Sequence, residues 1–290
     1  MGIAAWEADE VRHANESERT PVLFVHGLWM LASSWQPWRS FFDQQGYATL
    51  APGWPDDPAT VEEGRAHPDV FAGKHITMIT DHYEEVARTL RRPPVIIGHS
   101  FGGLITQQLA GRGLAIASVA IDSAPFRGVL PLPFSALKGA FPVIGNPGNY
   151  RRQVMLTFEQ FRYSFANAIE EREARELYDR YPVPGSGMPL FQAAFANVKP
   201  STEAAVDSLN PDRGPMLMIT GGDDHIAPPA ILRASFAKQK RNPSTTEMVE
   251  VPGRGHSLVF DSGWQDVAAI ALSFVQRFAP ASPNPAQRAE

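Results

Sequence analysis

The chain has 290 residues, with 26 lysines and arginines against 31 acidic residues, a formal net charge of −5, and a hydrophobic content of 43%. It contains no cysteine, which excludes disulfides, thiolate nucleophiles and cysteine-ligated zinc or iron–sulfur sites. The mildly acidic balance argues against nucleic-acid binding, because the chain has no basic stripe to meet phosphates. No apolar run approaches the roughly 20 residues of a membrane helix. Glu7, Asp9 and Glu10 stand where a signal peptide would carry positive charge, so we expect a cytoplasmic protein.

Short apolar segments alternate with longer helical patterns along the chain. The expected strands cover residues 21–26, 47–51, 94–98, 116–122, 215–220 and 246–251. The expected helices cover residues 34–45, 76–90, 102–112, 229–239 and 264–278. This alternation, with strands that are apolar along their whole length, predicts an α/β fold built on a doubly wound, mostly parallel sheet.

Residues 126–209 interrupt the alternation, because they show helical periods and no convincing strand. We interpret this segment as an inserted helical cap, so that residues 1–125 and 210–278 form one α/β core. The composition of residues 279–290 is typical of a disordered tail. Most aromatic side chains of the cap are expected to form its own core and the rest to line an apolar pocket; the phenylalanines are Phe126, Phe134, Phe141, Phe158, Phe161, Phe165, Phe191 and Phe195.

Residues 98–102, Gly-His-Ser-Phe-Gly, match the pattern G-x-S-x-G between an expected strand and an expected helix. In this setting the pattern predicts a strained turn that exposes the Ser100 hydroxyl, with glycines where a Cβ atom would collide. The helix that follows directs its free N–H groups at the same place. Ser100 is therefore the candidate nucleophile, and the alternative is an N-cap serine in an ordinary turn.

A serine hydroxyl needs a base to remove its proton as it attacks. His256 is the best-placed histidine, because it lies in a glycine-rich loop between the last expected strand and the last expected helix. His99 adjoins Ser100, but we expect it to point elsewhere and to pack against or support the site. Four others are expected in loops or on polar helix faces, exposed to solvent: His13, His67, His75 and His82.

The base in turn needs a carboxylate that fixes its tautomer and stabilises the imidazolium formed during attack. Asp223 and Asp224 directly follow the expected strand 215–220. Either one gives the chain order serine, aspartate, histidine, which differs from the order in chymotrypsin or subtilisin. The residues alone leave both aspartates open.

Taken together, these motifs make the chain resemble the α/β-hydrolase fold superfamily, in its capped, cofactor-free branch of serine esterases and haloperoxidase-like hydrolases. The matching segments follow the family's order: VLFVHGLW at 22–29, GHSFGG at 98–103, DSAP at 122–125, GGDDHIAP at 221–228 and GRGHS at 253–257. In similar enzymes the acid precedes a residue, an aliphatic pair and a proline, so the resemblance implies Asp224, with Asp223 as the fallback. It also implies an oxyanion hole formed by the backbone N–H groups of Leu28 and Phe101. Only about 20 residues precede the first expected strand, so the family's usual antiparallel edge strands are expected to be short or missing.

No metal or cofactor is expected. A serine at this turn disfavours the relatives that use a carboxylate nucleophile, and no G-x-G-x-x-G follows the first expected strand as a dinucleotide site would require. His26 is interpreted as orienting its loop. His225 with Asp223 and Asp224 imitates a metal cluster, but adjacent residues offer poor ligand geometry.

The sequence therefore predicts a serine hydrolase that cleaves a carboxylic ester, or a related acyl bond, of a small apolar or aromatic molecule through an acyl-enzyme intermediate. Trp29, Trp54, Phe126 and Phe165 are predicted to bind the substrate. The same triad suits lactone, amide or C–C cleavage or perhydrolysis, and a hydrolase-like ligand receptor is a third alternative. No nucleic-acid or membrane partner is expected, and both a monomer and a homodimer remain open.

Overall fold

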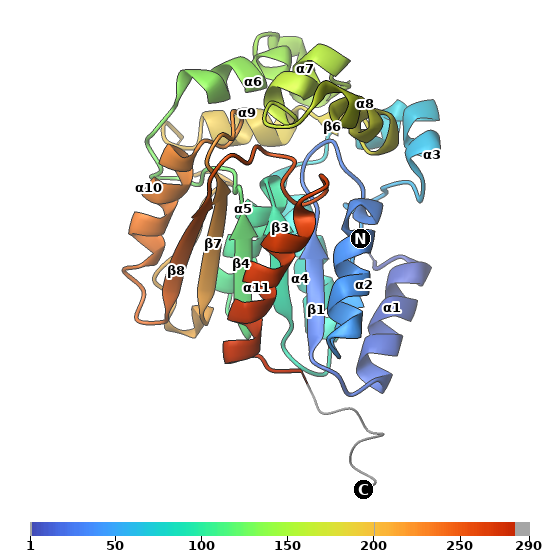
Figure 1. Ribbon diagram of the computed structural model, residues 1–290, viewed down its shortest axis with the longest axis vertical. Helices are drawn as coiled ribbons and strands as arrows, with labels where there is room; N and C mark the ends of the chain where they lie inside the picture. Colours follow the sequence, from blue (N-terminus) through green and yellow to red (C-terminus); the bar gives the residue numbers. More distant parts are fainter. Residues whose placement is uncertain (1, 200, 282–290) are drawn as a thin grey trace, which may run out of the picture.

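The computed structural model describes residues 2–199 and 201–281, and its centre is a six-stranded sheet in which every neighbouring pair of strands is parallel (Figure 1). The spatial order of the strands is β2-β1-β3-β4-β7-β8. Their bounds are β1 (Pro21–Val25), β2 (Ala48–Leu50), β3 (Val95–His99), β4 (Ala117–Ile121), β7 (Met216–Gly221) and β8 (Thr246–Val251). All six expected strands are present with ends shifted by at most one residue, and the expected α/β fold class is confirmed.

The order of the strands creates a switch point between β1 and β3. The chain leaves β1 for β2 on one side and then returns to place β3 on the other, with Val25 of β1 paired to Gly98 of β3. The loops that leave the carboxyl ends of these two strands diverge there. In open parallel sheets this is where ligands bind.

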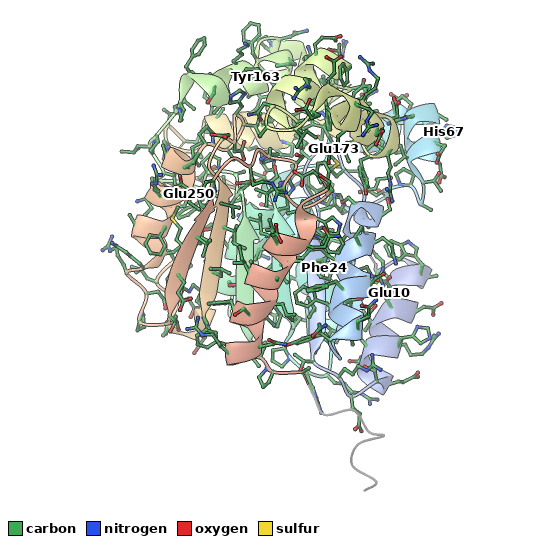
Figure 2. The ribbon with its side chains drawn as sticks, viewed as in Figure 1. Glu10, Phe24, His67, Tyr163, Glu173 and Glu250 are labelled. Carbon is green, nitrogen blue, oxygen red and sulfur yellow. The ribbon has the colours of Figure 1, made fainter. Side chains whose placement is uncertain are left out.

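Helices cover both faces of the sheet. Helices α2 (Gln36–Gln44) and α11 (Trp264–Phe278) contact each other on one face, and α4 (Ile76–Thr89), α5 (Phe101–Gly111) and α10 (Pro229–Gln239) lie on the other (Figure 1). The side chains of the central strands are buried on both sides, as covered parallel strands require. Phe24 of β1, labelled in Figure 2, stacks on Trp35 with ring centroids 5.0 Å apart.

Several helices at the amino-terminal end differ from expectation. Helix α1 (Ala5–Glu16) was not expected, and it packs beside the edge strand β2. No antiparallel strand precedes β1 among the described residues. In place of the expected helix at 34–45 there is a 3-10 turn (Ala32–Trp35) followed by α2, and a short helix α3 (Val61–Ala66) lies in a stretch without an expected element. The apolar pattern of α1 is weak, since it buries only Glu7, Val11 and Ala14.

Residues 126–199 and 201–209 form a layer of helices above the carboxyl ends of the strands (Figure 1). The helices are α6 (Phe134–Ile144), α7 (Phe158–Ser164), α8 (Glu171–Arg180) and α9 (Met188–Ala194). The expectation of no strand here is wrong for two residue pairs, β5 (Gln153–Val154) and β6 (Gly185–Ser186), which form a short antiparallel ladder. Two-residue strands have no periodicity that a sequence could display. The division of the chain into a core and an inserted cap stays a prediction.

The start of the expected tail is packed. Ala279 is buried and its carbonyl accepts a hydrogen bond from the Tyr47 hydroxyl at 3.0 Å, while the Pro280 carbonyl accepts one from Thr20. The expectation of a disordered tail from residue 279 is therefore wrong at its first residues, because the bottom of the sheet offers them polar partners. The rest of the expected tail, 282–290, lies outside the described residues. Within the described ranges, no helix is long and apolar enough to cross a membrane.

Candidate active site

Ser100 occupies a strained turn between β3 and α5. Its backbone has φ 58° and ψ −121°, a region that non-glycine residues rarely adopt. The glycines on either side are required by close backbone approach: a Cβ at Gly98 would lie 2.1 Å from the Gly102 carbonyl oxygen, and a Cβ at Gly102 would lie 2.0 Å from that of Val25. The turn therefore pushes Ser100 out at the carboxyl end of β3, next to the end of β1.

His256 and Asp224 lie together below the helical layer. The His256 Nδ1–H donates to Asp224 Oδ2 at 2.6 Å. The other oxygen of Asp224 accepts from the backbone N–H groups of Ile226 at 2.7 Å and Ala227 at 2.9 Å. These bonds leave the Asp224 carboxylate no freedom to turn, and they keep His256 in the tautomer with Nε2 unprotonated.

The structure favours Asp224 over Asp223. Asp224 is buried and reaches His256, whereas Asp223 is exposed and its backbone carbonyl accepts a bond from Asn167. The turn after β7 therefore buries one of the two successive aspartates and exposes the other.

Ser100 and His256 line the same pocket. The buried Nε2 of His256 has no hydrogen-bond partner among the described residues, and the Ser100 hydroxyl is not bonded to it here. Such contacts often tighten only when a substrate is bound. Ser100 and His256 thus face one pocket, and Asp224 is joined to His256.

The loop that carries Leu28 lies directly against the nucleophile. A Cβ at Gly27 would stand 2.8 Å from the Ser100 Cβ, so only a glycine lets this backbone approach. Phe101 is the first residue of α5, where backbone N–H groups have no partner within the helix. The two residues expected to form an oxyanion hole therefore lie beside Ser100, one on the loop after β1 and the other at the start of α5.

A buried ionic network supports the loop after β1. The His26 Nδ1–H donates to the Gly27 carbonyl at 3.0 Å, and His26 Nε2 lies 3.2 Å from Asp57 Oδ2. Asp57 pairs with Lys74, and both side chains are 4% exposed. Neither Asp57 nor Lys74 was singled out in the sequence, since nothing in their local pattern distinguishes them from surface charges.

Trp54 belongs to this support and not to the pocket. Its ring stacks on His26 with centroids 5.2 Å apart, and its backbone N–H donates to Asp57 at 3.0 Å. The prediction that Trp54 binds substrate is wrong for this structure, because the tryptophan fills the space behind the loop. Phe126 is likewise buried in the hydrophobic core outside the pocket, since the chain turns inward immediately after β4.

Trp29 and Phe165 do line the pocket, with ring centroids 5.9 Å apart, and Phe165 also contacts His256 edge-on at 4.9 Å. Ser100 and His256 are the polar side chains of the lining apart from the Trp29 indole, whose N–H already donates to the Val154 carbonyl. The rest of the lining is apolar and includes Leu132, Ala136, Leu137, Ala140, Ile144, Leu190, Ala193 and Ile226. A pocket without a charged side chain suits an uncharged, apolar ligand.

His99 and Asp122 adjoin the site from below. The His99 and His256 rings lie 4.5 Å apart, and burial, with a smaller effect of His256, holds the pKa of His99 well below its usual value. Asp122, which the sequence marked only within a family motif, is fully buried at the end of β4. Its Oδ1 accepts from the Gly221 N–H at 2.8 Å, and its Oδ2 lies 3.9 Å from His256 Nδ1.

Three of these side chains are a conceivable metal set. His99, Asp122 and His256 each offer a ligand atom, and these atoms lie within 4.8 Å of one another. The His256 Nδ1 is, however, already bonded to Asp224 at 2.6 Å, and Asp122 Oδ2 is 3.9 Å from it. This spacing suits a hydrogen-bonded cluster better than a compact coordination sphere.

The four histidines that were expected to be exposed to solvent differ in their surroundings. His13 and His67 are exposed as expected, and Figure 2 shows His67 at the outer rim beside α3. The expectation is wrong for His82, which is buried and bonded to Glu7 at 3.0 Å, whereas His75 is 32% exposed and bonds Glu203 at 2.6 Å. Their partners are 75 and 128 residues away in the chain, beyond any local pattern.

The aromatic residues of the helical layer also fall into groups. Phe161 and Phe165 stack in its core, 5.2 Å apart. Phe134 and Phe141 of α6 and Phe195 after α9 are 80%, 67% and 49% exposed. They belong neither to the core of the layer nor to the pocket, which the sequence interpretation did not foresee.

The parallel sheet, the strained serine turn and the buried histidine–aspartate pair define an enzyme of the α/β-hydrolase type. Comparison of the sequence with protein families agrees, because the model of the alpha/beta hydrolase family matches residues 22–270. The chain belongs to this family.

Solved structures share the fold at low sequence identity. A monoacylglycerol lipase from Paleococcus ferrophilus superposes with a TM-score of 0.61 at 18% identity, covering 90% of this chain and 98% of the lipase. An extracellular α/β-hydrolase from a Paenibacillus species gives 0.62 at 17%, covering 88% and 98%. A putative non-heme bromoperoxidase from Mycobacterium tuberculosis gives 0.62 at 17%, covering 89% and 92%. No curated protein matches the sequence.

Proposed function

We propose that this chain is a serine esterase that hydrolyses a carboxylic ester of a small, apolar molecule. One observation carries the proposal: His256 is anchored by Asp224 through Nδ1 and presents an unpartnered Nε2 to the same pocket that Ser100 lines. A base held in one tautomer in the same pocket as a serine hydroxyl meets the requirement for nucleophilic acyl transfer.

The reaction proceeds in two halves. As the Ser100 Oγ attacks the ester carbonyl, His256 Nε2 takes the serine proton and then gives it to the departing alcohol, leaving an acyl-enzyme. Water enters next, His256 removes its proton, and the acid leaves as Ser100 is protonated again. Asp224 stays ionised throughout and stabilises the imidazolium that forms in each half.

As Ser100 attacks, negative charge develops on the carbonyl oxygen. We assign the stabilisation of this charge to the backbone N–H groups of Leu28 and Phe101. Each such donor contributes about 3 kcal/mol to transition-state stabilisation in enzymes of this kind. The network of His26, Asp57 and Lys74 supports the proposal, because it fixes the loop that carries Leu28 before the substrate arrives.

The pocket indicates the class of ester. Apart from Ser100 and His256, its lining offers apolar side chains and the Trp29 and Phe165 rings, with no cation to receive a substrate carboxylate. We assign Trp29 and Phe165 to substrate binding. The helices of residues 126–209 act in this proposal as a cap, since α6 and α9 supply much of the pocket wall.

The test is the hydrolysis of p-nitrophenyl butyrate by wild type, Ser100→Ala and the matched control Ser135→Ala, whose serine lies on α6 outside the pocket lining. We expect Ser100→Ala to lower kcat by at least about 10⁴-fold, with an unchanged melting temperature or a higher one, and Ser135→Ala to retain activity. Activity that survives Ser100→Ala, or wild-type protein with no hydrolysis across an acyl-chain series, would contradict the proposal.

A further inference from the structure

Two carboxyl groups, and not one, face the candidate base. Asp224 follows β7 and Asp122 directly follows β4, and the two side chains are 3% and 0% exposed. Asp224 uses its oxygens to accept from Ile226, Ala227 and His256. Asp122 Oδ1 accepts from Gly221, whereas Oδ2 has no hydrogen-bond donor among the described residues.

The pair has no cation to neutralise it. The titratable groups that face Asp122 are Asp224, His256 and His99, and no lysine or arginine in the described part of the chain bonds to either aspartate. Two adjacent buried carboxylates without a counter-ion cannot both stay ionised, so one of them takes up a proton. Burial first, and then the charge of Asp224, raise the pKa of Asp122 well above its ordinary range.

We propose that Asp122 is a positioning residue that holds this proton on Oδ2 and donates it to the Asp224 carboxylate. The pair then carries a single negative charge opposite His256, and Asp224 is held by a fourth donor. The proton stays between the two carboxyl groups through the reaction, and no bond to the substrate is made by Asp122. The catalytic part of this inference rests on the proposed esterase function, while the protonation state is independent of it.

Infrared spectroscopy tests the protonation state without any activity. Wild-type protein with ¹³C-labelled aspartate side chains should show a protonated carboxyl C=O band at pH 7, and Asp122→Asn should remove it. A spectrum with ionised aspartates alone, or a band that Asp122→Asn leaves in place, overturns the proposal.

The pH profile tests the role of the pair. Because Asp122 is already neutral, Asp122→Asn should move the acidic midpoint of kcat/KM by less than about 0.3 pH unit, and its amide should replace the donor. Asp122→Leu removes the donor and should lower kcat by at least about 10-fold with little change in KM. If Asp122 were ionised, Asp122→Asn would remove a charge beside His256 and lower the midpoint by about 1 pH unit or more, which overturns the proposal.

A second observation, independent of the triad, concerns the outer face of α6. Phe134 and Phe141 lie two turns apart on this helix and are 80% and 67% exposed, and Leu130 and Leu132 just before it are 75% and 59% exposed. Large apolar side chains gathered in this way on a soluble surface mark an interaction site. We call these four residues the α6 face.

The chain segment that carries the α6 face, residues 126–158, has charges of one sign. Residues 126–158 contain four cations and no acidic residue, in a chain whose net charge is −5. Lys138 lies on α6 over the Tyr163 ring, and Arg151 and Arg152 end the turn that packs beside α6. An anionic surface complements such a face. A two-fold contact with a second copy would instead bring these like charges together.

The α6 face is continuous with the pocket. Leu132 and Leu137 line the pocket and are also 59% and 37% exposed. We infer that the α6 face docks on an anionic lipid surface, with Phe134 and Phe141 inserted among the acyl chains and the basic residues at the headgroups.

Vesicle co-sedimentation with the Ser100→Ala variant tests this inference without turnover. We expect binding to phosphatidylcholine vesicles containing phosphatidylglycerol at least about 10-fold tighter than to pure phosphatidylcholine, weakened by salt. Phe134→Ser with Phe141→Ser should abolish it, and Trp6→Ser, at a 45% exposed site on α1, should not. Absence of binding, or equal binding by the double variant, overturns the inference. So does a wild-type dimer in light scattering that the double variant converts to monomer.

Discussion

The imidazole rings of His99 and His256 lie 4.5 Å apart, centroid to centroid, and His99 is 2% exposed with no partner for its Nε2 among the described residues. Burial, more than the nearby His256, lowers the pKa of His99 well below its usual value. The base therefore has an uncharged neighbour when it becomes an imidazolium, and no like charge opposes that step.

This relationship predicts a pH dependence of stability. The folded chain keeps His99 neutral, whereas the unfolded chain protonates it below about pH 6.5, so the free energy of unfolding falls as the pH drops through that value. His99→Phe removes this contribution. Between pH 7 and pH 5, the decrease in the free energy of unfolding should be smaller in the variant than in wild type, by up to about 2 kcal/mol. Urea unfolding at the two pH values measures this difference. His67→Phe, at an exposed site, is the control, and a pH dependence identical in His99→Phe and wild type would contradict the prediction.

Asp223 and Asp224, which are neighbours in the chain, give a matched pair of variants. Asp224→Asn should lower kcat by about 10⁴-fold, because the amide can leave His256 in the wrong tautomer. Asp223→Asn should keep activity within a few-fold, since its side chain points to solvent and makes no contact with His256. Equal losses in the two variants would show that the acid has been assigned to the wrong residue.

Replacing the buried Lys74 is expected to lower both stability and activity. Lys74→Met leaves the Asp57 carboxylate buried without its partner, which should lower the free energy of unfolding by about 3–5 kcal/mol. The loop after β1 depends on Asp57 through His26, so kcat should fall more than KM rises. Adding Asp57→Asn should recover part of the stability, and the exposed Lys240→Met is the control. A Lys74→Met variant as stable as the control would contradict this role.

The pocket predicts a change in chain-length preference. Ala193 lies on α9 in the pocket wall, and Ala193→Phe would fill space that an acyl chain needs. We expect kcat/KM for p-nitrophenyl octanoate to fall by at least about 10-fold and that for the acetate to change by less than about 3-fold. Ala230→Phe adds the same bulk at an exposed position of α10. Parallel changes for both esters in Ala193→Phe would place the acyl site elsewhere.

How much could be predicted from sequence depended on whether a residue carries a local pattern. Ser100 stands in a glycine-flanked turn and His256 in a glycine-rich loop, so both could be selected from the sequence. In the structure both residues line one pocket. The strands could be predicted because burial on both faces makes them continuously apolar. Lys74 was missed and Asp122 was marked only within a family motif, because their importance comes from partners 17 and 99 residues away.

The aromatic residues show the same limit. Composition marked Trp54 and Phe126 as candidates for the pocket in the same way as Trp29 and Phe165, yet only the second pair lines it. An aromatic side chain buries its ring wherever space is available, and that space is defined by the packed fold. Phe134 and Phe141 show the reverse case, in which no space is available within the described chain.

The central claim is that Ser100 is the nucleophile of an acyl transfer, and covalent labelling tests it most directly. A fluorophosphonate should inactivate the protein with one adduct per chain, mapped by peptide mass spectrometry to Ser100, and ester hydrolysis should disappear in proportion to labelling. The label should not attach to Ser100→Ala, and Asp224→Asn should slow its attachment. An adduct on another residue, or full esterase activity in protein labelled at Ser100, would contradict the account.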